Sequence, residues 1–193
     1  MSQDQAPRRR ADARRNVDAL LEAARAVFAT SGVDAPAKEI TDRAGVGVGT
    51  MYRHFPQRAH LVKAVVESNI DAVADAAPAL SAAHEPAEAL TAWIRRFADL
   101  LATKRGLASA LHSGDPAFEG LPAYFLERLG PALAGLLDAA VAAGTVRADL
   151  SAEDLLHAIT QLCRPVPGLP PEHNQRILAV FLDGLRRDAA QTS

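Results

Sequence analysis

Four polar side chains of different chemistry lie close together in one short stretch of the chain, residues 48–55. They are the hydroxyl of Thr50, the phenol of Tyr52, the guanidinium of Arg53 and the imidazole of His54. If this stretch is helical, Met51 and Phe55 share the opposite, apolar face because they are one turn apart. Hydrogen-bonding groups on a short exposed helix suit the phosphates and base edges of a nucleic-acid groove. The stretch therefore predicts binding to a polyanion.

A second short helix and a glycine turn come directly before this stretch. In residues 38–44, Ile40 and Ala44 lie one turn apart and form one apolar face. The turn Gly45-Val46-Gly47 follows, and glycine allows the left-handed backbone that a tight turn requires. Two short helices joined in this way indicate a helix-turn-helix, whose second helix enters the major groove of DNA.

A longer helix is expected before this pair. Apolar residues recur at helical spacing over residues 17–28, which predicts a helix over residues 14–31 with Gly32 as its C-terminal cap. The polar residues 1–13 show no periodicity and contain Arg8-Arg9-Arg10, so we expect a mobile basic arm there.

The rest of the chain also reads as helices, because no stretch alternates between polar and apolar residues with period two. A helix over residues 57–76 is roughly 30 Å long by the helical rise, which is enough to connect two domains. Pro78 and Pro86 bracket a short linker after it. Pro131 is expected to kink a later helix, and Ser151 fits the N-cap of the next one. The later helices are expected over residues 86–104, 106–112, 121–143, 151–163 and 172–190, and the fold class is all-α.

Charge is distributed unevenly along the chain. The formal net charge is −2, but residues 1–63 hold eleven Lys and Arg against seven Asp and Glu, whereas residues 64–193 hold ten against sixteen. A basic N-terminal region on an acidic body indicates that one end meets a polyanion, although a solvated charged face gives the same balance. The single Cys163 and the lack of a long apolar run predict a cytoplasmic protein that does not enter the membrane.

Three other patterns resemble enzyme sites without completing one. The run Gly45 to Thr50 lacks the lysine and the preceding strand of a phosphate-binding loop. His112, Ser113 and Asp115 are the residue types of a hydrolase triad, but neighbours in one turn seldom point at one another. The histidines have no HxxH or HxxxH spacing, so no metal site is predicted. We therefore expect neither an enzyme nor a bound cofactor.

With these elements in place, the sequence resembles the TetR (tetracycline-repressor-type) family of transcriptional regulators. The resemblance covers residues 14–66 and is carried by Ile40 and by the run AGVGVGTMYRHFPQRAHLVKAV that follows it. Beyond residue 76 it is a resemblance of helical layout, and the segment 93–111 is similar to the SbtR-like branch of the family. It implies a helix-turn-helix DNA-binding domain over residues 14–60 and a ligand-binding and dimerisation domain over residues 61–193.

Carried over position by position, the resemblance implies which residues meet DNA. Thr50 and Tyr52 match positions that typically contact phosphates, Arg53 lies near the edge of the contact, and Arg58 matches a phosphate anchor. Val48 stands where relatives often have a polar or basic residue, so a thymine methyl suits it and direct reading of bases is thin. The expected DNA-binding residues are Lys38, Thr41, Val48, Gly49, Thr50, Tyr52, Arg53, His54 and Arg58.

The resemblance also implies two sites in the larger domain. The last two helices would pack against a two-fold mate as a four-helix bundle through Leu155, Ile159, Leu162, Ile177, Val180, Phe181 and Leu185. An effector pocket is expected near Trp93, Phe97, Leu101, Leu111, Tyr124, Phe125 and His157. Trp93 and Phe97 also fit core positions, and Tyr124 and His157 fit either a satisfied core position or a polar group inside a pocket.

Together these expectations describe a homodimeric, ligand-responsive regulator, a repressor, that binds a palindromic operator in double-stranded DNA. Its partners are that operator, a small-molecule effector and a second copy of the chain. Effector binding is expected to shift the long fourth helix and to change the spacing of the recognition helices. The alternative is a protein of the same fold that senses small molecules, or serves as a scaffold, without sequence-specific DNA binding.

Overall fold

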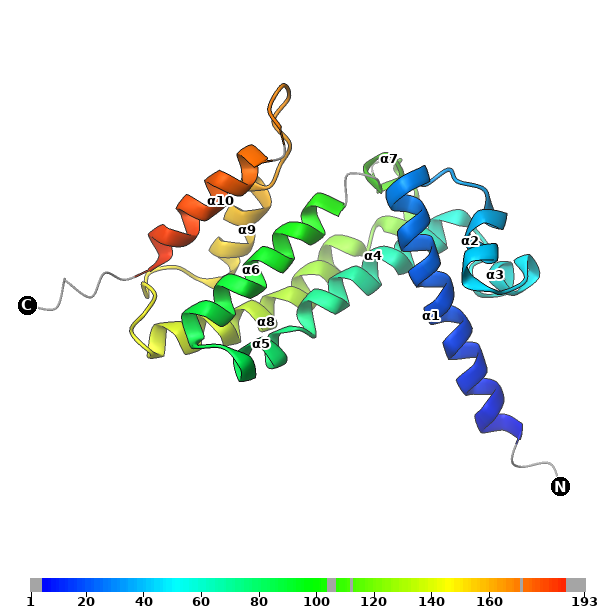
Figure 1. The fold of residues 1–193 in the computed structure, drawn as a ribbon, viewed down its shortest axis with the longest axis horizontal. Coiled ribbons are helices and arrows are strands. Elements are labelled where there is room, and N and C mark those ends of the chain that lie inside the picture. Colours follow the sequence, from blue (N-terminus) through cyan, green and yellow to red (C-terminus); the bar gives the residue numbers. More distant parts are fainter. Residues whose placement is uncertain (1–4, 104–106, 112, 171, 187–193) are drawn as a thin grey trace, which may run out of the picture. The chain divides into compact units, whose positions relative to one another are not determined.

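The computed structural model describes residues 5–103, 107–111, 113–170 and 172–186, and these residues are mainly helical (Figure 1). The only pairing of extended backbone within these ranges is an isolated antiparallel bridge between Val146 and Arg186. The predicted all-α fold is therefore confirmed. None of the described helices combines the length and the apolar content needed to cross a bilayer.

Contacts between residues divide the chain into two compact units. The N-terminal unit comprises Met1–Ser68 and Thr103–Leu121, and the C-terminal unit comprises Asn69–Ala102 and Pro122–Ser193. The division falls inside the helix α4 (Arg58–Ala74), later than the domain boundary expected after residue 60. A continuous helix can contribute apolar residues to two cores, so its sequence carries no sign of the boundary.

The N-terminal unit is built on α1, which packs against α2 and α3. The buried residues of α1 recur every three or four positions, from Leu20 to Phe28, as an amphipathic helix requires. Ile40, Met51 and Phe55 are also buried, as predicted. The elements of this unit are α1 (Gln5–Ser31), α2 (Ala37–Ala44), α3 (Val48–His54), the first part of α4, α7 (Ala108–Leu111) and the 3-10 helix η2 (Pro116–Phe118).

The C-terminal unit holds the larger core. Its largest fully buried side chains include Trp93, Phe97, Leu129, Leu133 and Ile159. The helices α9 and α10 pack side by side. The elements of this unit are the end of α4, α5 (Ala77–Ala83), most of α6 (Pro86–Thr103) and of α8 (Leu121–Ala142), α9 (Ala152–Leu162) and α10 (Glu172–Leu185).

Two segments differ from their expected structure. The segment 1–13 was expected as a mobile arm, but α1 begins at Gln5 and includes most of it. Its alanines and arginines favour a helix, and Pro7 lies in the first turn, where no backbone N–H is needed. The expected linker between Pro78 and Pro86 contains the helix α5, and Pro78 again occupies a first-turn position.

The N-cap expected at Ser151 is confirmed. Ser151 caps α9 in a capping box, in which its hydroxyl oxygen accepts from the Asp154 N–H and the Asp154 carboxylate accepts from the Ser151 N–H. The helix α8 includes Pro131 without interruption, and the expected kink there stays a prediction. Three end points of expected helices, Lys104, Gly106 and His112, lie outside the described residues, as do residues 187–190.

Candidate functional site

The short helix α3 presents one buried residue and a broad exposed face. Met51 is 3% exposed, whereas Val48 is 40% and Tyr52 is 49% exposed. Gly49 and Arg53 are also exposed, and Thr50 and His54 are half-exposed. An apolar anchor beneath an accessible row of valine, tyrosine and arginine leaves this face available to a macromolecule. Six of the nine expected DNA-binding residues lie on α3, and none of these six is buried.

The turn before α3 has the geometry that the glycines predict. Gly45 adopts a left-handed conformation with φ of 68°, and its N–H donates to the Asp42 carbonyl. The Val46 N–H donates to the Thr41 carbonyl at 3.1 Å, which closes the end of α2. A side chain at position 45 would be strained by the positive φ, so the turn that directs α3 away from α2 depends on glycine here.

Arg58, at the start of α4, ties together the segment that supports α3. Its Nε donates to the Val33 carbonyl at 2.8 Å and its Nη2 donates to the Ala35 carbonyl at 2.7 Å. Its guanidinium carbon lies 4.8 Å from the centroid of the Phe28 ring, within cation–π distance. Burial lowers the pKa of Arg58, and the nearby Asp34 acts in the opposite direction. The sequence suggested a phosphate anchor; the structure adds a second, internal role that sequence reasoning missed.

The two residues expected on α2 differ in their exposure. Lys38 is exposed, and its Nζ lies 2.5 Å from the Asp42 carboxylate one turn later. Thr41 is only 1% exposed, and its hydroxyl donates to the Lys38 carbonyl. Thr41 is therefore corrected from a backbone-contact candidate to a buried residue of the helix-turn-helix. Arg43, in the last turn of α2, is exposed and basic, and it was not among the expected contacts.

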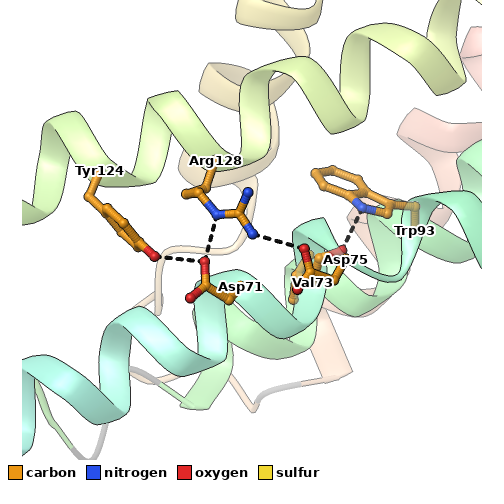
Figure 2. Close-up of polar contacts among 6 residues, drawn as sticks. All are labelled: Asp71, Val73, Asp75, Trp93, Tyr124 and Arg128. Carbon is orange, nitrogen blue, oxygen red and sulfur yellow. Dashed lines mark hydrogen bonds and ion pairs between the residues drawn. The ribbon is translucent and has the colours of Figure 1, made fainter.

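Three of the expected pocket residues form an aromatic row in the C-terminal unit. The rings of Trp93 and Phe97, on α6, have centroids 5.7 Å apart. The Phe97 ring lies 5.6 Å from that of Phe125, on α8. Trp93 and Phe97 are fully buried, and the Trp93 indole N–H donates to the Val73 carbonyl near the end of α4 at 2.8 Å (Figure 2). Both side chains occupy core positions, which the sequence allowed beside a pocket wall.

A polar cluster joins α4 to α8 in the same unit. One oxygen of Asp71 accepts from the Tyr124 hydroxyl at 2.7 Å and from Arg128 Nε at 2.6 Å (Figure 2). Arg128 Nη2 also donates to the Asp75 carboxylate at 2.8 Å. These hydrogen bonds, first to Asp71 and then to Asp75, raise the pKa of Arg128. Tyr124 was expected as a pocket residue, whereas its partners Asp71 and Arg128 were not singled out.

The remaining pocket candidates differ in burial and in the unit to which they belong. Leu101 is half-buried near the end of α6. Leu111 belongs to the N-terminal unit. His157 has an exposed side chain on α9, so it is neither the core residue nor the enclosed polar group that the sequence allowed. Spacing along one helix cannot distinguish an enclosed histidine from one at the border of the apolar face.

The expected dimer residues divide into two groups. Leu155, Ile159 and Leu185 are buried within the chain itself, at 1%, 0% and 4% exposure. Leu162 and Phe181 are half-buried. Ile177 and Val180, by contrast, are 40% and 70% exposed on α10. The accessible apolar stripe is therefore narrower than the sequence suggested, because Leu155, Ile159 and Leu185 pack inside the chain.

The hairpin of α9 and α10 is held firmly. The Asn174 side chain is nearly buried, and its amide donates to the carbonyls of Leu162 and Arg164 at the end of α9. Near the other end of α10, the Arg147 N–H donates to the Leu185 carbonyl. The amide of Asn174 thus satisfies carbonyls that the end of α9 leaves without helical partners. These hydrogen bonds fix α10, which carries the stripe, to the end of α9.

Two residues of the pattern that resembles a hydrolase triad form hydrogen bonds within a turn. The Ser113 hydroxyl accepts from the Asp115 N–H, and the Asp115 carboxylate caps η2 by accepting from the Ala117 N–H. Both residues thus have turn-forming roles, while His112 lies outside the described residues. Within the described part of the chain, no group of three or more His, Cys, Asp or Glu side chains is placed to hold a metal ion.

Comparison with known proteins gives consistent matches. Residues 20–65 match the model of bacterial regulatory proteins of the tetR family, and residues 85–187 match the C-terminal domain of SbtR-like transcriptional regulators. A TetR transcriptional regulator from Streptomyces coelicolor is 37% identical with a TM-score of 0.74, covering 90% of this chain and 99% of its own. A TetR regulatory protein from Mycobacterium vanbaalenii is 39% identical with a TM-score of 0.72, covering 92% and 99%. The comparison with curated proteins gives no match.

Proposed function

The chain belongs to the TetR family of bacterial transcriptional regulators, and we propose that it is a ligand-responsive, homodimeric repressor that binds a palindromic operator. The observation that carries the proposal is the exposed face of α3. Val48, Tyr52 and Arg53 point away from the buried Met51, on a helix directed by the Gly45 turn. This is the arrangement in which a recognition helix meets the major groove.

The composition of α3 supports recognition that relies mainly on the DNA backbone. Thr50 and Tyr52 carry hydroxyl groups, and Lys38 on α2 carries an amine, and these donors suit phosphate oxygens. Val48 and Gly49 offer no hydrogen bond to a base edge, and the valine suits a thymine methyl. Arg53 and His54 are the side chains best able to donate to bases. We therefore expect DNA shape to contribute to operator choice together with a few direct contacts.

The stripe on α10 supports a two-fold dimer. Val180 and Ile177 are large apolar side chains that remain exposed on the α9–α10 hairpin, and Phe181 extends the same stripe. Exposed apolar stripes of this kind mark association surfaces. A two-fold axis through this surface gives an isologous interface and two recognition helices about 34–36 Å apart, one turn of DNA.

The C-terminal unit supports an effector site among α4, α6 and α8. The aromatic row ending at Phe125 supplies apolar contacts, and the neighbouring Tyr124 carries a hydroxyl. Ligand sites are mostly apolar with a few placed polar groups. We propose that an effector binds here and shifts α4, so that the two recognition helices of the dimer no longer match successive grooves. The effector then needs only to prefer the arrangement that cannot bind DNA.

Selection from random double-stranded DNA tests the repressor proposal against the sensor or scaffold alternative. The full-length protein is mixed with a randomised duplex pool, and the bound fraction is amplified and sequenced over several rounds. We expect enrichment of an inverted repeat whose half-sites are about one helical turn apart. A pool that stays without any inverted repeat contradicts the repressor proposal and favours the alternative.

Sedimentation velocity tests the dimer independently of DNA. Wild-type protein is expected to sediment as a dimer at micromolar concentration. Val180→Glu places a charge in the exposed stripe and is expected to shift the protein towards monomer without unfolding it. Gln175→Ala, an exposed position of the same helix that is not on the side of Ile177 and Val180, is the control and is expected to leave the dimer unchanged. A folded wild-type monomer under these conditions contradicts the dimer.

A further inference from the structure

The helix α4 has residues in both compact units. It runs from Arg58 to Ala74, and the N-terminal unit ends at Ser68 within it. At its start, Arg58 donates hydrogen bonds to the carbonyls of Val33 and Ala35 in the N-terminal unit. A helix is a stiff connection, so a force that moves one end along the axis moves the other end too. Contacts that hold the last turns of α4 in the C-terminal unit are therefore expected to influence the position of the helix-turn-helix.

Four side chains hold those last turns against α8, and we call them the α4–α8 latch: Asp71, Asp75, Tyr124 and Arg128. Asp71 lies in the last turn of α4, and Asp75 directly follows the helix, with its N–H donating to the Asp71 carbonyl at 2.8 Å. Tyr124 and Arg128 are one turn apart on α8. Side chains at this spacing lie on the same face of a helix. The two pairs therefore face each other (Figure 2). Asp71 accepts hydrogen bonds from the Tyr124 hydroxyl and from Arg128 Nε, and Asp75 accepts one from Arg128 Nη2.

This geometry depends on the axial position of α4. The Arg128 guanidinium is planar and spans two carboxylates that are one turn apart, while the Tyr124 hydroxyl meets the same oxygen as Arg128 Nε. A shift of α4 by one turn, about 5.4 Å, moves one carboxylate out of reach of Arg128. It also breaks the two hydrogen bonds that share one oxygen of Asp71. Geometric selectivity of this kind is the property that distinguishes arginine pairs from looser lysine pairs.

The latch is also accessible, unlike the neighbouring hydrogen bond that α6 makes to α4. The side chains of Asp71 and Arg128 are each 36% exposed, and that of Asp75 is 71% exposed. The Trp93 indole, which donates to the Val73 carbonyl between these two aspartates, is by contrast fully buried. Exposed charge pairs are weakened by salt and can exchange partners, whereas a buried indole bond is not screened in this way.

We propose that Arg128 is a positioning residue that holds α4 in the arrangement that binds DNA, and that release of the α4–α8 latch is the step through which the C-terminal unit controls the N-terminal unit. The proposal rests on the proposed function, because it assigns the control of DNA binding to named residues. An exposed but geometrically selective contact fits this role because allosteric couplings are modest, typically 5- to 150-fold in affinity. The latch gives α4 a defined position that a modest competing interaction can release.

The first measurement compares operator affinity between latch variants. Arg128→Gln removes the charge and keeps a polar side chain, and it is expected to weaken operator binding about tenfold, within the usual range of couplings. Asp71→Asn is expected to act in the same way, and the double variant is expected to be no weaker than either single variant. Arg95→Gln, an exposed arginine on α6, is the matched control and should bind as the wild type does.

The second measurement follows the position of the two units without DNA. Spin labels are placed at Gln57→Cys and Asp138→Cys, both exposed, in a Cys163→Ser background, and labelled chains are diluted with unlabelled ones. Pulsed dipolar spectroscopy then gives the distance between labels within one chain. The Arg128→Gln variant is expected to broaden or shift this distribution, and high salt is expected to move the wild-type distribution the same way.

The two measurements separate the possible failures. If Arg128→Gln leaves the label distribution identical to that of the wild type, Arg128 does not position α4 and the inference is overturned. If the label distribution changes but wild-type protein selects no operator, the proposed function fails while the positioning role stands. Unchanged thermal stability of Arg128→Gln alongside a changed distribution supports positioning over a merely structural role.

Discussion

Two arginines hold the two ends of α4, and they do so by different chemistry. Arg58 donates to the backbone carbonyls of Val33 and Ala35 and lies against the Phe28 ring. Arg128 donates to the carboxylates of Asp71 and Asp75, which are accessible to solvent. Carbonyl partners are neutral and fixed by the fold, whereas exposed carboxylates are screened by salt. One end of the helix is therefore fixed, and the other is held by a contact that solution conditions can change.

The largest expected effect is that of Arg58→Ala on stability. The substitution removes two charge-assisted hydrogen bonds and leaves two carbonyls without these donors, so a loss of about 3 kcal/mol is expected. Urea unfolding followed by far-ultraviolet circular dichroism measures it. Arg53→Ala, on the exposed face of α3, is the control and is expected to stay within about 0.5 kcal/mol of the wild type. Equal stability of the two variants contradicts the internal role of Arg58.

The same variant tests whether Arg58 also contacts a phosphate. If it does, the slope of log affinity against log salt becomes shallower by about one unit in Arg58→Ala, and all DNA sequences lose affinity alike. Fluorescence anisotropy with labelled duplexes at several salt concentrations gives this slope. An unchanged slope leaves Arg58 with its internal role and removes it from the phosphate contacts.

Trp93→Phe is expected to have the next largest effect, because it breaks the buried bond at the C-terminal end of α4. Phenylalanine keeps an aromatic ring near Phe97 but leaves the Val73 carbonyl without the indole donor. The expected cost is about 1–2 kcal/mol in urea unfolding. Thr91→Val, also on α6, removes a hydroxyl bond to the Ala87 carbonyl within one helix and should cost less. A reversed order of the two variants argues against the importance of the Trp93 bond.

Arg128→Gln is expected to change stability less than either of these substitutions, by less than about 1 kcal/mol, because its ion pairs are exposed. The effect should shrink as salt is raised, whereas the loss in Arg58→Ala should persist, because its carbonyl partners are neutral. Unfolding measured at low and at high salt for both variants makes the comparison. A salt-independent loss in Arg128→Gln would remove the distinction between the two ends of α4.

Tyr124→Phe is expected to have the smallest effect, about 0.5 kcal/mol, because Arg128 still satisfies the Asp71 oxygen that the hydroxyl shares. In the Arg128→Gln background the same substitution should cost more, since Asp71 then loses both donors. A double-mutant cycle in urea unfolding measures this coupling. Strict additivity of the two substitutions indicates that the two donors act independently.

Local chemistry made much of this fold predictable. Gly45 and Ser151 act through residues at most four positions away, so the turn and the cap of α9 follow from local sequence. The burial of Met51 follows from helical spacing, which places it on one face with Phe55. The helix α5 was missed because Pro78 is both a linker residue and a first-turn residue, and local sequence does not decide between them.

Contacts between distant residues account for what could not be predicted. Arg128 and Asp71 are 57 positions apart, and Arg58 and the Val33 carbonyl are 25 apart. No periodicity pairs residues over such distances. Prediction from the apolar faces of α9 and α10 is limited in a related way. An apolar stripe in the sequence does not show whether Leu155 packs inside the chain or against a second copy.

The central claim is that the exposed face of α3 binds operator DNA, and one binding measurement tests it most directly. Fluorescence anisotropy is recorded for a duplex enriched from the random pool, with wild-type protein, the double variant Tyr52→Ala/Arg53→Ala, and the control Arg95→Ala/Arg96→Ala on exposed positions of α6. We predict at least a tenfold loss of affinity for the α3 variant, from one phosphate and one base-edge contact, and less than a twofold change for the control. Equal affinity of wild type and α3 variant, with both folded and dimeric, would contradict the account.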